Sequence, residues 1–205
     1  YNLNTKFINV LFEKQNGVKP RLGDIFKQTK VLSGSGSNNR NFTLLGDPAL
    51  HLAYPQLNIR TSIINDTLKA LGEVNVEGYI VNDFDQVVED FSGVIYATVL
   101  DKEIIRSTLG QQSCVPMPYR DQNNILYKGS ASVENGFFSF SFIVPKDIAY
   151  NYGKGKVSYY AVSDDEDPID ANGSYTDCVI GGIAEEITYD YDGAEIKLFM
   201  NTRSF

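Results

Sequence analysis

Residues 125–144 read ILYKGSASVENGFFSFSFIV, and this stretch decides the fold class. After residue 136, serine alternates with large apolar residues, so that three phenylalanines fall on one face: Phe138, Phe140 and Phe142. An exposed stripe of this kind could bind a ligand, but alternation with serine favours a buried face. Asn135-Gly136 separates this run from an alternating run before it, which is typical of a two-residue hairpin turn. The stretch therefore predicts a β-hairpin with a phenylalanine face in the core.

The same two-residue period recurs from Gln56 onward. Alternating or short apolar runs are separated by turn-forming residues and cover residues 57–61, 74–80, 94–100, 156–162 and 178–183. About seven short strands at such spacing are typical of an immunoglobulin-like or fibronectin-like sandwich. We therefore predict a mainly β fold, with a β-sandwich over residues 56–185.

The first 33 residues follow the helical period instead. Apolar residues recur on one helical face at Leu3, Phe7, Ile8 and Leu11, and Pro20 opens a second predicted helix. A flexible loop over 33–41 and a short apolar strand over 42–45 are expected next. A lone strand leaves its ladder groups unpaired. We therefore expect this segment to pack against a structure that the chain lacks, or against the sandwich.

Charge and hydropathy limit the possible partners. The 205 residues carry a formal net charge of −8. Nucleic-acid binding needs a basic face that neutralises phosphate, so this composition disfavours a nucleic-acid partner, and we expect none. No apolar run approaches the roughly 20 residues of a transmembrane helix. We expect no transmembrane segment.

Few residues could carry out nucleophilic chemistry. A cysteine nucleophile needs an imidazole within hydrogen-bond reach. His51 is the only histidine, and its position after the predicted strand favours an exposed linker side chain. Cys114 lies in a loop with two prolines, and Cys178 lies at a strand. A disulfide between them is an alternative in an oxidising compartment, but two buried free thiols fit better.

Longer motifs resemble one peptidase family. Residues 21–55, with RLGD and then NFTLLGDPALHLAYP, are similar to the end of the catalytic domain in gingipain-type cysteine peptidases. Further motifs resemble the sandwich that follows this domain in one branch, the sortase-like peptidase of the Bacteroidetes type IX (Por) secretion system. They are DTLKALGEVNVEGYIVND (66–83), DFSGVIYATVLDKE (90–103), NNILYKGSASVENGFFSFSFIVPKDI (123–148) and GKGKVSYYA (153–161). In the family, a strand similar to AEIKLFMN (194–201) opens the next domain.

The resemblance implies a domain organisation. Residues 1–55 would be the C-terminal helices and last strand of an α/β, caspase-like peptidase domain, and residues 56–185 an immunoglobulin-like sandwich. Residues 186–205 would be a linker and the first strand of a following domain. The Cys nucleophile and His base of the family lie upstream of the matched segment. We therefore assign no catalytic, cofactor-binding or metal-binding residue to this chain.

The resemblance also implies a function for the parent protein. The parent would be a cysteine endopeptidase of the cell surface, extracytoplasmic and outer-membrane associated, which removes C-terminal secretion signals. This chain would be an inactive segment, whose sandwich braces and spaces the catalytic domain. Its partners would be the upstream and downstream domains of the parent, and type IX secretion components. The alternative is a stand-alone immunoglobulin-like module that binds a glycan or a secretion-system partner. An exposed aromatic platform would favour that alternative.

An acidic run and a possible glycosylation site each allow two interpretations. The acidic residues at 164–170 are Asp164, Asp165, Glu166, Asp167 and Asp170. Their carboxylates could hold calcium, but they lack the spacing of an EF-hand loop. A solvated hairpin tip is therefore the favoured interpretation. Asp66-Thr67-Leu68 is similar to the acceptor pattern for O-glycosylation in Bacteroidetes. The other interpretation of Thr67 is an ordinary turn hydroxyl.

Overall fold

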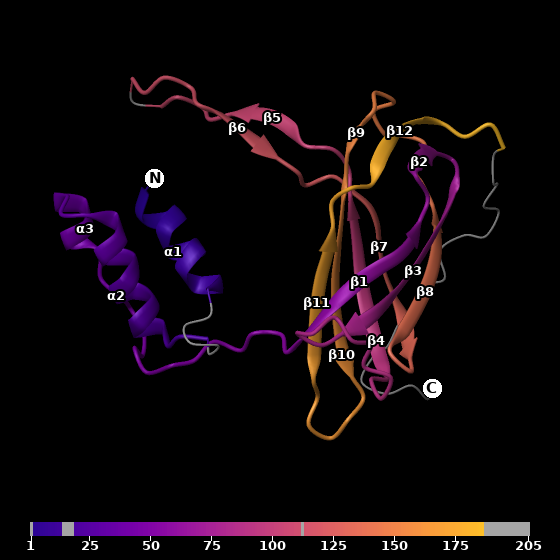
Figure 1. Ribbon diagram of the computed structural model, residues 1–205. Helices are drawn as coiled ribbons and strands as arrows, with labels where there is room; N and C mark the ends of the chain where they lie inside the picture. The colour runs from indigo at the N-terminus through magenta and orange to yellow at the C-terminus, as the bar shows by residue number, and fades with distance from the viewer. Residues whose placement is uncertain (1, 14–18, 112, 187–205) are drawn as a thin grey trace, which may run out of the picture. The chain divides into compact units, whose positions relative to one another are not determined.

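The chain divides into two compact units, residues 1–54 and 55–205. The computed structural model describes residues 2–13, 19–111 and 113–186. All described helices lie in the first unit, and all described strands lie in the second (Figure 1). The strand expected over 194–200 lies outside the described residues.

The first unit is built on two helices, as the helical period predicts. They are α1 (Asn2–Phe12) and α2 (Leu22–Ser33), and α2 begins two residues after Pro20. Val10 of α1 and Ile25 of α2 are fully buried. The hydroxyl of Tyr54 donates a 2.8 Å hydrogen bond to the carbonyl of Leu11, which ties the end of the unit to α1.

Two local predictions for the first unit are wrong. Part of the expected loop over 33–41 forms a short helix, α3 (Ser37–Asn41). Residues 42–45 follow it with extended backbone at Phe42 but form no strand. The physical reason is that no described strand pairs with them, and a strand exists only through its ladder.

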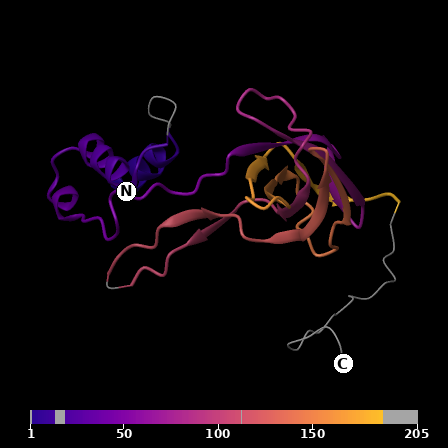
Figure 2. The ribbon, with the colours of Figure 1, turned by 90° about the horizontal axis from the view of Figure 1, so that it is seen from below.

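Seven strands of the second unit form a closed ring in the order β1-β11-β10-β4-β7-β8-β3 (Figure 2). The bounds are β1 (Leu57–Ile64), β3 (Glu73–Val81), β4 (Gly93–Leu100), β7 (Ile125–Glu134), β8 (Phe137–Ile143), β10 (Lys156–Ser163) and β11 (Asp170–Tyr175). The predicted mainly β fold is confirmed, and the five strand runs read from the sequence all contain strands.

The ring is a sandwich whose two edges are joined by short ladders. One sheet has the order β11-β10-β4-β7, and the other has the order β1-β3-β8. Strands within a sheet pair over most of their length, as β10 and β4 do from Lys156↔Leu100 to Ser163↔Gly93. By contrast, β7 and β8 pair only beside their turn, and β1 and β11 pair in parallel at two positions. These seams give every strand of the ring a neighbour on both sides, although each seam pairs only two positions.

Two smaller sheets extend the ring. β2 (Thr67–Ala70), β12 (Val179–Ile183) and β9 (Gly153–Lys154) form a three-stranded sheet in the order β2-β12-β9. β5 (Ile104–Ser107) and β6 (Pro118–Asp121) form a two-stranded ribbon that projects from the ring (Figure 1).

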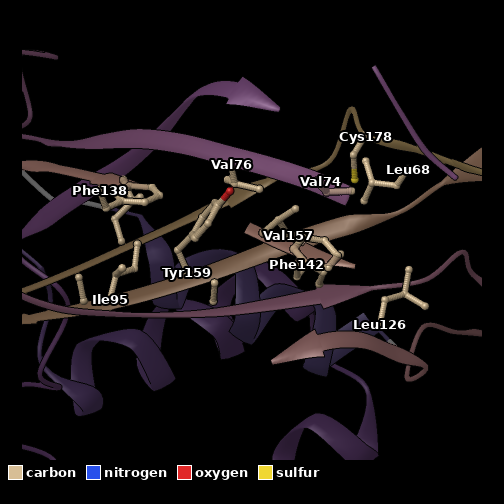
Figure 3. Close-up of a cluster of buried hydrophobic side chains, with 14 of the residues drawn as sticks. Leu68, Val74, Val76, Ile95, Leu126, Phe138, Phe142, Val157, Tyr159 and Cys178 are labelled. Atoms are coloured by element: carbon tan, nitrogen blue, oxygen red, sulfur yellow. The ribbon is translucent and has the colours of Figure 1, made fainter. Parts of the chain in front are cut away.

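The core lies between the two sheets (Figure 3). Phe138 and Phe142 of β8 are buried, and Phe140 is half-buried at the edge of the same cluster. The ring of Tyr127 stacks on Phe142 and Phe140, with centroid distances of 4.6 and 5.4 Å. The interpretation of the phenylalanine stripe as core is therefore confirmed.

The predicted Asn-Gly hairpin turn joins β7 to β8. Asn135 and Gly136 have φ angles of 50° and 80°, which is the geometry of a type I′ turn. The Gly136 amide donates to the Phe91 carbonyl at 2.8 Å, and the Gly136 carbonyl accepts from Ile80 at 2.7 Å. A Cβ on Gly136 would lie 2.5 Å from the Val88 carbonyl oxygen. Only glycine fits this position without strain.

Replacing Gly136 with alanine should destabilise the second unit by about 2 kcal/mol, because the side chain clashes and disfavours the positive φ. Urea unfolding monitored by circular dichroism measures the change. Asn135→Gly is the matched control, since it relaxes the same turn, and its effect should stay below about 1 kcal/mol. Equal losses in both variants would contradict this account of the turn.

Candidate functional site

The single histidine belongs to a unit that has no cysteine. His51 is exposed, as expected for a linker side chain. Both cysteines of the chain, Cys114 and Cys178, belong to the second unit. The first unit therefore holds an imidazole without the nucleophile that a cysteine peptidase needs.

The two cysteines differ in their surroundings, and both thiols are free. Cys178, directly before β12, is only 1% exposed. Burial raises the pKa of the Cys178 thiol, which disfavours the reactive thiolate. Cys114 is exposed between β5 and β6, so its predicted burial is wrong. The physical reason is that this part of the chain projects from the ring, away from the core.

The acidic residues lie where a solvated tip is expected. Asp164 to Asp167 are exposed between β10 and β11, and Asp170 accepts a 3.4 Å hydrogen bond from the Tyr160 hydroxyl. Among the described residues, no three side chains of the metal-binding types gather into one group. Thr67 is the half-buried first residue of β2.

A buried ion pair lies at the base of the projecting ribbon. Asp101 and Lys102 follow β4, and their side chains are only 8% and 9% exposed. The Lys102 Nζ lies 2.9 Å from Asp101 Oδ1 and donates a 2.8 Å hydrogen bond to the Ala149 carbonyl. Asp101 Oδ2 accepts from the Asn124 side chain at 3.2 Å. Every charge of the pair is thus compensated by a named partner, as a buried charge requires.

The same residues hold the base of the arm, the segment formed by residues 103–111 and 113–122. The Asp101 carbonyl accepts from the Gln122 side chain, and the Asp101 amide donates to the Asn124 carbonyl, both at 2.8 Å. Gly153 leaves room for the Lys102 stem, since a Cβ there would lie 2.6 Å from its Cδ. The arm therefore leaves the ring from an anchored base, while its apolar side chains are exposed farther out: Ile105, Leu109 and Val115.

A cleft of about 550 Å³ lies beside this base. Its lining includes Lys102, Arg120, Lys154 and Lys156, with Glu103 as the carboxylate. Three of these cations already have acidic partners, because Arg120 pairs with Glu103, Lys154 with Asp177 and Lys102 with Asp101. The cleft is therefore less basic than its lining suggests.

Sequence reasoning missed this anchor. Asp101 and Lys102 are adjacent charged residues after a strand, a pattern that usually marks a solvated loop. Their burial results from β9 and the segment around Ala149, which lie about 50 residues farther along the chain. No local signal in the sequence identifies such a contact.

Lys102→Met should destabilise the second unit by about 3 kcal/mol, because it leaves the Asp101 carboxylate buried without its cation. The free energy of unfolding in urea measures this. Lys154→Met is the matched control, since it breaks the Lys154–Asp177 pair, whose side chains are more than two thirds exposed. The control should leave the unfolding midpoint unchanged. A similar loss in both variants would contradict the anchoring role of Lys102.

Comparison with known proteins relates the chain to a peptidase family. Residues 1–53 match the model of Peptidase family C25. The structure of dimeric latent PorU from Porphyromonas gingivalis matches 96% of this chain at 27% identity, with a TM-score of 0.61. The chain spans 20% of that PorU chain. No curated protein sequence matches.

Two other solved structures share less with the chain. Spo0M, a sporulation control protein from Bacillus subtilis, matches 63% of this chain and 51% of its own at 16% identity, with a TM-score of 0.35. MtrC from Shewanella baltica matches 65% of this chain and 23% of its own at 14% identity, with a TM-score of 0.29. The resemblance to gingipain-type peptidases therefore rests on the first 53 residues, which match family C25, and on similarity to PorU over most of the chain.

Proposed function

We propose that this chain is a non-catalytic segment of a PorU-like cysteine peptidase. Residues 1–55 complete an α/β peptidase domain, and the sandwich over 56–185 braces that domain and spaces it from a following one. The observation that carries the proposal is the apolar surface of the helical unit. Among the described residues of this unit, seven large apolar side chains are exposed: Ile8, Phe12, Val31, Leu32, Phe42, Leu45 and Leu50.

This apolar surface outweighs the core of the unit. In its described part, Val10 and Ile25 are the buried apolar side chains of the two long helices. A core of this size stabilises a domain by far less than ordering its backbone costs. The match of residues 1–53 to family C25 supports the same conclusion, because the matched residues end next to the boundary between the two compact units.

Residues 42–45 support the same proposal. Phe42 and Leu45 are exposed, and they line an open hollow of about 360 Å³ together with Asn41 and Thr43. In the parent these residues form the last strand of the peptidase sheet, where both faces of a parallel strand are covered. The upstream part of the domain supplies the pairing strand.

The chemistry of the parent is acyl transfer through a cysteine thioester. The upstream domain supplies the Cys and His, and the enzyme removes C-terminal signals from secreted proteins at the outer membrane surface. In the described part of this chain, no helix is long and apolar enough to cross a bilayer. The similarity to PorU supports this role, and secretion-system components are the proposed partners.

The 205-residue chain should not cleave peptides, because its buried thiol is unreactive and its exposed thiol lies on the arm. A panel of fluorogenic peptides tests the wild type beside Cys114→Ala and Cys178→Ala. Turnover that either substitution abolishes would mean that this chain holds its own nucleophile. Turnover that survives both would point to non-cysteine chemistry and contradict the proposed family role.

Leu45→Glu tests whether the first unit belongs to a larger domain. Leu45 is 93% exposed in this chain, so the substitution should leave the helical circular-dichroism signal of the 205-residue chain unchanged. In the full polypeptide encoded by the same gene, it should destabilise the peptidase domain by about 3 kcal/mol, because it buries a carboxylate. Equal melting curves for wild type and variant in the full polypeptide, or a gene without an upstream peptidase segment, would overturn the proposal.

A further inference from the structure

The outer face of the sheet β11-β10-β4-β7 carries two tyrosines at its centre. Along β4 and β10, buried residues alternate with outward-facing ones. Tyr159 points into the core (Figure 3), so its neighbour Tyr160 points outward. Tyr96 of β4 and Tyr160 are 50% and 43% exposed. Large aromatic side chains therefore lie on the solvent face of a sheet whose core is already filled.

Strand register makes the two tyrosines direct neighbours. Tyr160 is paired with Tyr96, and their ring centroids lie 6.4 Å apart with an interplanar angle of 23°. In the same row, Asn172 of β11 lies beside Tyr160, and Ser130 of β7 lies beside Tyr96. Two nearly parallel rings thus stack on each other across the two central strands of this sheet, and we call this pair the aromatic platform.

Polar side chains flank this platform on three sides, and two valines, Val94 and Val162, lie next to it on the fourth. The row on one side holds Ser174, Ser158, Thr98 and Lys128, and the row on the other holds Asp170, Val162, Val94 and Ser132. Six of the twelve positions in the three rows are serine, threonine or asparagine, and the two charges occupy opposite corners. In the described part of the chain, none of these six polar side chains makes a hydrogen bond. The face therefore offers free hydroxyl and amide groups on three sides of an apolar centre, which includes the two valines.

We infer that this face binds a neutral polysaccharide, with Tyr96 and Tyr160 stacking on its sugar rings. A sugar ring has an apolar face of C–H groups and a rim of hydroxyls. The aromatic platform matches the face, and the surrounding serine, threonine and asparagine side chains match the rim. Four strands spaced about 4.8 Å apart make the face about 14 Å wide. An open surface of that width suits several linked sugars rather than a single one.

Other ligand classes fit the face less well. Nucleic acid and anionic lipid need several cations, and Lys128 is the only one among the twelve positions. Protein interfaces are enriched in tyrosine but depleted in serine, and serine holds four of the twelve positions here against two for tyrosine. Anionic polysaccharides would meet Asp170 as well as Lys128. The platform is the feature expected of the alternative glycan-binding module, but a sandwich that braces a peptidase domain can carry such a face as well. This inference therefore does not depend on the proposed peptidase role.

Affinity electrophoresis tests the inference. The 205-residue chain is run in native gels that contain dextran, mannan or galactan as neutral probes, or alginate as an anionic one. At least one neutral probe should retard the wild type. The double variant Tyr96→Ser/Tyr160→Ser should raise the apparent Kd about tenfold or more, whereas Tyr160→Phe keeps the ring and should bind almost normally.

Two further variants separate binding from folding. Ser130→Asp leaves both rings in place and adds a charge beside them, so it should also weaken retardation. Tyr119→Ser removes an aromatic ring of similar exposure, 48%, from the arm and should not. A melting temperature within a few degrees of the wild type shows that a variant is folded. If the double variant is not folded, the retardation of Ser130→Asp alone tests the inference.

Several outcomes would overturn the inference. The first is that no neutral probe changes the mobility of the wild type, and the second is that alginate alone retards it. The third is that the double variant and Ser130→Asp are both still retarded like the wild type. Sedimentation velocity tests whether a second copy of the chain binds to this face instead. A dimer that dissociates in the double variant would assign the face to self-association and would also overturn the inference.

Discussion

The second unit depends on the pairing of strand edges. Each strand exposes backbone donors and acceptors along both sides, and each unpaired group costs free energy when it is buried. In the ring, the two sheets meet at β1–β11 and at β7–β8, so that every strand has two neighbours. The second of these seams depends on the positive φ angles of Asn135 and Gly136. A two-residue turn therefore holds one side of the ring closed.

The closed ring of strands determines whether each side chain of a strand faces the core or the solvent. Alternate residues must face either the core or the solvent, and this separates neighbours such as Tyr159 and Tyr160 into different roles. Tyr159 packs inside, where its hydroxyl bonds to Thr61 at 2.9 Å and burial raises its pKa to about 12. Tyr160 faces outward and joins Tyr96. The core that stabilises the ring and the face proposed to bind sugars thus come from one alternating pattern.

The two units differ in how completely they satisfy the same physical demands. The ring buries its apolar residues between two sheets and leaves no strand without partners. The helical unit exposes more large apolar side chains than it buries among its described residues, and residues 42–45 form no ladder. This contrast supports the proposal that the first unit is the end of a domain and that the sandwich is a domain in its own right.

The amino-acid sequence alone determined those features whose causes are local. Alternation marked the strands near 57–61, 94–100 and 137–144, Asn135-Gly136 marked the hairpin, and the motifs LLGDPAL and DFSGVIYATVLDKE indicated the peptidase family. Tertiary structure decided the features that need distant partners. They are the missing strand at 42–45, the exposure of Cys114, the burial of Asp101 with Lys102, and the meeting of Tyr96 with Tyr160 across strands about 60 residues apart. The physical reason is that period and turn chemistry act between neighbours in the chain, whereas burial and pairing depend on which segments the fold brings together.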